Sequence, residues 1–175
     1  MKSLDSTLLK KFLRLAAESL EGDWLLVGGT LLPAVGLNVR TTVDIDLVGL
    51  GKKEAAQGLE LMRLTEKLGL SVETINQTAS FFLNKIDYKK QDLLLLTEGK
   101  KARIYRPSLL LYWQLKLPRM TESDYTDCIH YFHYCQKQDK KTPKETLLKA
   151  IVKQEKKSPT AEKMQRLTSL KSLLD

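Results

Sequence analysis

Two short segments in the first half of the chain carry the residue types best suited to chemistry. The first is Val27-Gly-Gly-Thr30, and the second, Asp44-Ile-Asp46, follows after thirteen intervening residues. A glycine pair has no side chain, so a phosphate can approach its backbone and accept N–H hydrogen bonds. Asp44 and Asp46 stand two residues apart, so on a strand both point to one face, where they can coordinate one Mg²⁺. The pattern predicts a metal-dependent site for a phosphorylated ligand.

Each segment also has a purely structural interpretation. A Gly-Gly pair often marks a tight turn, and Asp-x-Asp is often the polar face of a half-solvated sheet. Two like charges on alternate positions beside an anion-binding turn are harder to explain by structure alone. The functional interpretation is therefore favoured.

The hydrophobic pattern predicts the elements that must position these residues. An amphipathic helix at residues 4–20, with Asp5 or Ser6 as its cap, precedes a buried strand at 24–27 that stops at the glycine turn. A short helix at 31–36 and a strand at 43–48 complete the motif.

Further elements follow along the chain. We expect a helix at 53–68, three strands near 72–75, 81–86 and 92–97, a possible fourth at 104–106, and turns at 87–90 and 98–100. From Pro107 the pattern is helical, with helices at 109–117, 121–137, 144–156 and 159–174, the last opened by Ser158 and Pro159. The predicted fold is α+β, with a mixed β-sheet flanked by helices in residues 1–106 and a C-terminal helical extension, 107–175, packed on it.

Composition excludes several classes of protein. The chain has 175 residues, 42% hydrophobic and 29% charged, and no apolar run reaches the roughly 18 residues of a membrane span. The N-terminus has the pattern of an amphipathic helix and not of a signal peptide. Cys128 and Cys135 lie seven residues apart on one predicted helix, about 10 Å, which is too far for a disulfide. We expect a cytoplasmic protein that does not associate with membranes.

The net charge of +8 is unevenly distributed. Residues 1–98 carry 12 Lys and Arg against 13 Asp and Glu, whereas residues 99–175 carry 17 against 8. Such a basic half suits a surface that meets nucleic-acid phosphates. A lysine-rich solvated face that serves solubility is an equally good interpretation.

The sequence resembles a family, the minimal nucleotidyltransferases of the DNA polymerase β superfamily, and in particular the bacterial AbiEii-like group. The resemblance covers about residues 20–135 and rests on two blocks in the right order. They are Gly28-Gly29-Thr30 with Arg40-Thr41-Thr42 and Asp44-Ile-Asp-Leu47, and later Lys116-Leu-Pro-Arg119 with Asp124-Tyr-Thr-Asp127.

This resemblance implies a nucleotidyltransferase-like sheet and a set of roles. Asp44 and Asp46 would hold Mg²⁺ or Mn²⁺. The residues implied to bind the nucleoside triphosphate, along the turn, the segment after it and the later block that lines the cleft, are Gly28, Gly29, Thr30, Arg40, Thr42, Lys116, Arg119 and Asp127.

The superfamily usually has a third carboxylate on a following strand, acting as base or second metal ligand. Here the candidates are Asp92 and, second, Asp87. Asp92 opens an apolar strand from which it could face the Asp pair, and its structural interpretation is a residue of the turn after Lys89 and Lys90. If neither serves, the site binds nucleotide without transferring it.

The later block has structural interpretations of its own. Lys116 lies on an otherwise apolar helix, where it either reaches nucleotide phosphates or extends to solvent. Thr121 and Asp124 have the spacing of a helix capping box, which gives Asp124 a structural role, whereas Asp127 has none. His130 and His133 share a helix face with Cys128 and Cys135 nearby, but buried or half-buried packing is a better account than zinc.

The expected function is a magnesium-dependent nucleotidyltransferase that moves a nucleoside monophosphate from a triphosphate to RNA, tRNA or a protein. The resemblance implies a toxin or phage-defence role with an antitoxin partner. One alternative is a catalytically degenerate nucleotidyltransferase fold that binds nucleotide, RNA or a protein. Another is a helical adaptor that acts through residues 144–175.

Overall fold

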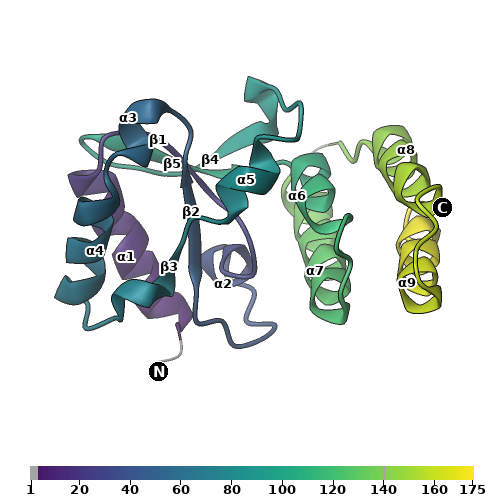
Figure 1. The fold of residues 1–175 in the computed structure, drawn as a ribbon, viewed down its shortest axis with the longest axis horizontal. Helices are drawn as coiled ribbons and strands as arrows, with labels where there is room; N and C mark the ends of the chain where they lie inside the picture. The colour runs from purple at the N-terminus through teal and green to yellow at the C-terminus, as the bar shows by residue number, and fades with distance from the viewer. Residues whose placement is uncertain (1–3, 140) are drawn as a thin grey trace. The chain divides into compact units, whose positions relative to one another are not determined.

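The computed structural model describes residues 4–139 and 141–175. The chain divides into two compact units, Met1–Pro107 and Ser108–Asp175 (Figure 1). The boundary lies one residue beyond the position predicted from the change to a helical pattern. The fold is α+β, as predicted, with a mixed sheet and flanking helices in the first unit and helices alone in the second.

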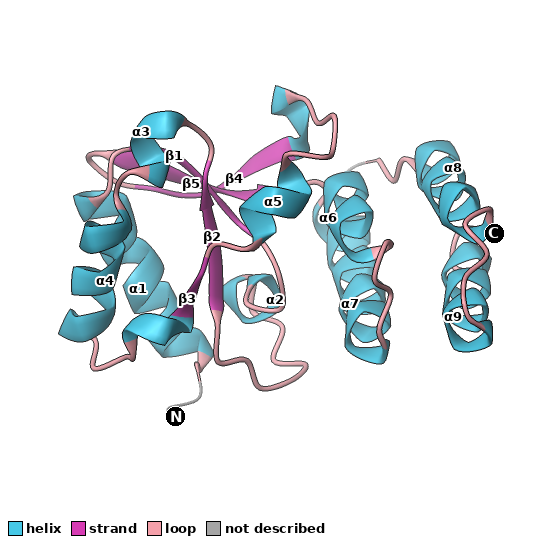
Figure 2. Cartoon of the chain, in the orientation of Figure 1, coloured by secondary structure: helices cyan, strands magenta, loops and turns pink. Residues whose placement is uncertain are grey.

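The first unit is built on a five-stranded sheet with the order β3-β2-β1-β5-β4 (Figure 2). β1 pairs antiparallel with β2 and parallel with β5, β2 pairs parallel with β3, and β4 pairs antiparallel with β5. The apolar residues of β1 are buried, which places this strand at the centre of the core. The strands are β1 (Gly22–Leu26), β2 (Ile45–Gly49), β3 (Ile75–Asn76), β4 (Leu93–Glu98) and β5 (Ala102–Pro107).

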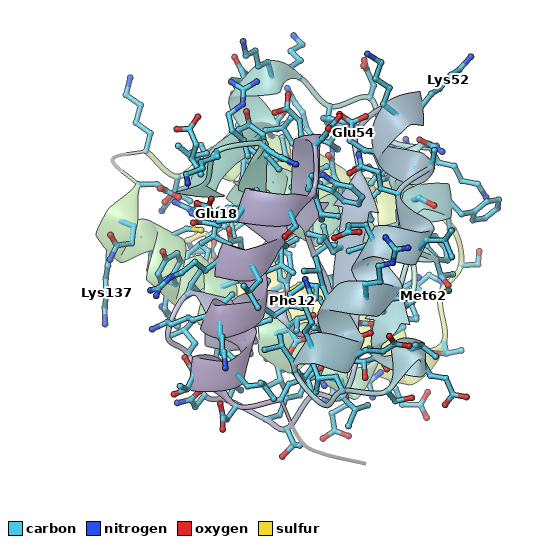
Figure 3. All side chains as sticks on the ribbon, turned by 90° about the vertical axis from the view of Figure 1, so that its left-hand side faces the viewer. Phe12, Glu18, Lys52, Glu54, Met62 and Lys137 are labelled. Atoms are coloured by element: carbon cyan, nitrogen blue, oxygen red, sulfur yellow. The ribbon has the colours of Figure 1, made fainter. Side chains whose placement is uncertain are left out.

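Five α-helices pack around the sheet in residues 4–107, the described part of this unit. The predicted N-terminal helix is α1, whose cap is Asp5; its carboxylate accepts a hydrogen bond from the Leu8 N–H at 2.7 Å. Phe12 is fully buried on the inner face of α1, and α4 lies alongside this helix (Figures 1 and 3). The helices are α1 (Ser6–Ser19), α2 (Leu31–Ala34), α3 (Lys52–Ala55), α4 (Gly58–Lys67) and α5 (Ala79–Leu83).

Several predicted elements differ from the structure. The strand predicted at 81–86 is wrong, because this apolar run begins as the helix α5; a short apolar run has no period that separates the two states. The helix predicted at 53–68 is divided into α3 and α4 at Gln57, whose side chain bonds the Glu21 backbone at 2.8 Å and 3.0 Å. The strand predicted at 72–75 is a 3-10 turn that ends in the two-residue β3.

The described part of the second unit, residues 108–139 and 141–175, contains four helices. α6 packs against α7, α8 against α9, and each pair also contacts the other. The core of this unit is aromatic and aliphatic. The bounds of its helices agree with the prediction except at the last helix, whose cap is Thr160 and not Ser158. The helices are α6 (Leu109–Lys116), α7 (Glu122–Gln138), α8 (Lys144–Glu155) and α9 (Ala161–Ser172). Across the residues that the structure describes, no helix is both long and apolar enough to cross a membrane.

Candidate functional site

The strand pairing brings the glycine turn and the aspartate pair together. β1 and β2 run antiparallel with Leu26 opposite Leu47, and the N–H of Val27 donates to the carbonyl of Asp46 at 2.9 Å. The turn that follows β1 therefore begins beside the residue that the sequence marked as a metal ligand. Two segments sixteen residues apart in the chain form one corner of the sheet.

Gly28 lies directly against the carboxylate of Asp46. Its φ of +66° is in the left-handed region, and a Cβ built on it would overlap the Asp46 side chain. Both the conformation and the contact require glycine at this position. The turn and the carboxylate thus form a single surface, in which the space left by the missing side chain of Gly28 is taken by Asp46 and not left open for a phosphate.

Thr30 joins the turn to the aspartate segment. Its hydroxyl donates to the carbonyl of Asp44 at 3.0 Å and accepts from the N–H of Asp46 at 3.2 Å. The residue is fully buried, and its side chain does not cap α2. The side chain of Thr30, expected to hold triphosphate, therefore fixes the backbone of the two acids in this structure.

Arg40 and Thr42 lie on the same corner of the sheet. A Cβ at Gly29 would overlap the guanidinium group of Arg40, so this cation covers the second glycine of the turn. Thr42 is buried and donates to the carbonyl of Asp44 at 3.4 Å. Of the two, Arg40 brings a permanent positive charge to the glycine turn, where a phosphate would bind.

Asn76 is a residue of this corner that the sequence analysis did not select. Its side-chain Nδ2 donates to Oδ1 of Asp46 at 2.7 Å, and its Oδ1 accepts from the N–H of Thr78 at 3.0 Å. The two contacts fix the orientation of the amide, because only the NH₂ can donate to a carboxylate. β3 pairs Asn76 directly with Asp46. This strand pairing alone identifies Asn76 as part of the site, and the pairing cannot be read from the sequence.

The donor set of the corner fits a hard divalent cation. Asp44 is exposed and Asp46 is half-buried, and both supply carboxylate oxygens, which Mg²⁺ and Mn²⁺ prefer. Asp44 immediately precedes β2, which begins at Ile45, two residues later than the predicted strand. Asn76 is hydrogen-bonded to Asp46, as an outer-shell group that orients a metal ligand would be.

The structure does not bring Asp92 to the aspartate pair. Asp92 lies just before β4, and β1 and β5 separate β4 from β2, a distance of about 14 Å at the usual strand spacing. Its carboxylate accepts from the N–H of Lys89 at 2.8 Å, which agrees with the turn interpretation. Asp87 is exposed in the segment between α5 and the 3-10 turn at Lys90–Asp92.

Lys116 and its acidic neighbours form a buried ion cluster in the second unit. The ammonium of Lys116 lies 2.9 Å from Oδ1 of Asp124 and 2.9 Å from Oδ2 of Asp127, and all three side chains are at most 6% exposed. Arg119 reaches Asp124 with two hydrogen bonds, of 2.7 Å and 2.8 Å. The predicted capping box is confirmed, because Thr121 and Asp124 bond each other's backbone. The interpretation that Lys116 extends to solvent is therefore wrong.

The electrostatics of the cluster keep Asp124 ionised. Burial opposes its charge, but the hydrogen bonds from Arg119 and the adjacent ammonium of Lys116 outweigh burial. The pKa of the Asp124 carboxyl is therefore held well below its usual value. Lys116 is paired with both Asp124 and Asp127. This ion cluster gives the Lys and Asp residues of the second block a structural role within the second unit.

The histidines and cysteines of α7 do not form a metal site. Both cysteines are buried on α7, in agreement with the packing interpretation, but His130 and His133 are exposed and do not pack in the core. Burial raises the pKa of the Cys128 thiol. Within residues 4–139 and 141–175, no group of three or more His, Cys, Asp or Glu side chains is arranged to hold a metal ion.

Comparison of the chain with models of protein families, with curated proteins and with solved structures gives no match in any of the three. The resemblance to the minimal nucleotidyltransferases therefore stays a prediction from the two sequence blocks.

Proposed function

We propose that the chain is a magnesium-dependent nucleotidyltransferase, which moves a nucleoside monophosphate from a nucleoside triphosphate to an acceptor. The observation that supports this most strongly is the contact between the glycine turn and the carboxylate of Asp46, with Arg40 over the second glycine. The glycine turn, the acidic pair and the guanidinium group of Arg40 occupy one corner of the sheet.

The reaction assigns each group a task. The acceptor hydroxyl oxygen bonds to the α-phosphorus, the bond to the β-phosphate breaks, pyrophosphate leaves and the hydroxyl proton passes to water. Mg²⁺ held by Asp44 and Asp46 would neutralise the phosphate oxygens and align them for displacement. Arg40 stabilises charge on the phosphates, and Asn76 holds Asp46 in place.

The acceptor that we favour is RNA, including tRNA, with a protein as the other possibility. The net charge of +8 favours a polyanionic partner. The resemblance to the AbiEii-like group adds a role as a toxin or in phage defence, with an antitoxin as protein partner. Such a protein would act in the cytoplasm.

One observation favours a second candidate function, nucleotide or RNA binding without transfer. Asp92 lies at the far edge of the sheet, so in the described part of Met1–Pro107 it adds no third carboxylate to Asp44 and Asp46. A base or second metal ligand alone contributes a factor of about 10²–10⁴ to the rate of such a reaction. A site with two acids and a phosphate turn could keep affinity and lose catalysis.

A transfer assay separates the two functions. The full chain is incubated with Mg²⁺, each triphosphate labelled at its α-phosphate and total RNA, and the products are resolved on a gel that also shows labelled protein. We expect label in RNA or protein with at least one triphosphate, and none with Asp46→Asn. Binding of triphosphate without transfer to any acceptor would favour the degenerate function, and neither binding nor transfer would exclude both.

A further inference from the structure

Two adjacent phenylalanines are exposed beside the candidate site. Phe81 is 57% and Phe82 is 47% exposed, whereas the other two phenylalanines, Phe12 and Phe132, are buried. Every aromatic residue of the chain lies in the described ranges, and these two alone are classed as exposed. Large apolar side chains grouped on a surface usually mark a binding site.

The pair is close to the metal-binding corner. α5 begins at Ala79, and its cap, Thr78, donates its N–H to the side chain of Asn76. Asn76 in turn donates to Asp46, and α5 packs against β2. A ligand seated on α5 therefore lies next to the carboxylates and not on a remote surface.

The geometry of the rings suits nucleobases. The ring centroids of Phe81 and Phe82 are 5.5 Å apart with an interplanar angle of 83°. The two rings form an edge-to-face pair, and rings so nearly perpendicular cannot stack on the same base. A ligand that uses both rings must therefore supply two bases. Base stacking on aromatic side chains tolerates any sequence, because every base has a π-face.

Positive charge accompanies the rings. The ammonium of Lys85 lies over one face of the Phe81 ring, 3.8 Å from its centroid, and Lys89 and Lys90 follow in the same segment, which also carries the exposed Asp87. A single strand carries one phosphate for each base. Aromatic rings can stack on the bases while neighbouring lysines bind the phosphates. One mononucleotide would use a single base and leave the second ring without a role.

We propose that Phe81, Phe82 and Lys85 form a stacking platform for a single-stranded RNA end, which it presents to the Asp44 and Asp46 corner. This platform locates the surface that would bind the acceptor and rests on the proposed function for its purpose, although its RNA binding is measurable without transfer. Bases can stack on these rings only when they are unpaired, so the platform should bind single strands in preference to duplexes.

The test measures fluorescence anisotropy of a labelled 12-nucleotide RNA with the full chain. Phe81→Ala/Phe82→Ala should weaken binding of the single strand at least about tenfold, given the usual strength of aromatic stacking. Binding of the same sequence as a duplex should change less than twofold. Lys85→Ala should weaken the single strand by a smaller factor, because it removes one charge.

The matched control is Leu59→Ala/Met62→Ala on α4. These side chains are 74% and 46% exposed, so the change removes similar exposed apolar surface, and Figure 3 shows Met62 projecting from its helix. RNA affinity should be unchanged in this variant, and both variants should melt close to the wild type because each removes side chains that are about half exposed or more.

Each other outcome overturns the platform. Unchanged RNA affinity in Phe81→Ala/Phe82→Ala would place RNA elsewhere, and weakened Mg²⁺-triphosphate binding by calorimetry with unchanged RNA binding would make the rings a site for the triphosphate base. A wild type that binds no RNA, or that is a dimer broken by the substitution, would also overturn it. Binding of Mg²⁺-triphosphate by the wild type in those cases would leave the proposed function standing.

Discussion

Gly28 is the residue on which the geometry of the site depends most directly. Its backbone has a positive φ and its missing side chain makes room for Asp46. Any Cβ must therefore displace the carboxylate as well as strain the turn. The two effects can be separated, because Gly36 has a positive φ of 89° and no atom within 4 Å of its Cβ position.

Gly28→Ala should lower both stability and ligand affinity, and Gly36→Ala should lower stability alone. Both changes force alanine into the left-handed region, at a cost of about 1–2 kcal/mol in the free energy of unfolding. Only the first moves Asp46, so Mg²⁺-triphosphate affinity should fall by more than tenfold in Gly28→Ala and by less than twofold in Gly36→Ala. Chemical denaturation and calorimetric titration check the two halves, and equal affinities would remove Gly28 from the site.

Asn76 should act on metal affinity through Asp46. Asn76→Ala removes the 2.7 Å hydrogen bond that orients the carboxylate. Outer-shell changes of this kind commonly weaken metal binding by about 10- to 100-fold. We expect Mg²⁺-dependent triphosphate affinity to fall in that range, while Gln77→Ala, an exposed neighbour, leaves it unchanged. Equal affinities in the two variants would show that Asn76 has no such role.

At the level of elements, the ion cluster between α6 and α7 determines how the second unit responds to substitution. Lys116→Met leaves Asp124 and Asp127 buried without their shared cation. Removing one partner of a buried pair typically costs about 3–5 kcal/mol. We expect a loss of this size in the free energy of unfolding. Arg119→Met should cost less than half as much, because the Arg119 side chain is 68% exposed. A stable Lys116→Met protein would contradict the structural role.

The same cluster predicts a dependence on acid. The pKa of Asp124 is lower in the folded chain than in the unfolded chain, so its charged form stabilises the fold. This contribution is complete above the unfolded pKa, about 3.9, and is lost as the pH falls below it toward the folded value. Asp124→Asn should therefore show a shallower loss of stability between pH 5 and pH 2.5 than the wild type.

The matched control for the acid series is Glu122→Gln, an exposed carboxylate in the same first turn of α7. Denaturant unfolding at each pH gives the slopes. The wild-type and Glu122→Gln slopes should agree, and an Asp124→Asn slope equal to both would contradict the assignment.

Elements with a clear period or a marked cap could be predicted from the sequence. α1, β1, the glycine turn and the helices after Pro107 lie close to their predicted ranges because leucine spacing and capping residues are local signals. The run around Phe81 was assigned to a strand because it is too short to show a period. The motif predicted the glycine turn and the aspartate pair, whereas the contact of Gly28 with Asp46, the role of Asn76 and the burial of Lys116 depend on tertiary pairing.

For the whole molecule, the net charge of +8 predicts strong salt dependence of RNA binding. Each neutralised phosphate of a single strand contributes about −0.7 to the slope of log affinity against log salt. We expect a slope steeper than −2 for the labelled 12-nucleotide RNA between 50 and 300 mM salt. Anisotropy is measured at fixed wavelengths and a fixed protein concentration. A slope near zero would show that the positive charge serves solubility.

The central claim is that the glycine turn and the aspartate pair form one site for a metal-bound triphosphate. Calorimetric titration of the full chain with each nucleoside triphosphate, with Mg²⁺ and with excess chelator, tests it most directly. We predict that at least one triphosphate binds only with Mg²⁺, and that Asp44→Asn/Asp46→Asn, which keeps shape and hydrogen bonding, melts like a folded protein but loses this binding. Triphosphate binding of unchanged affinity in the folded double variant, or none in the wild type, would contradict the account.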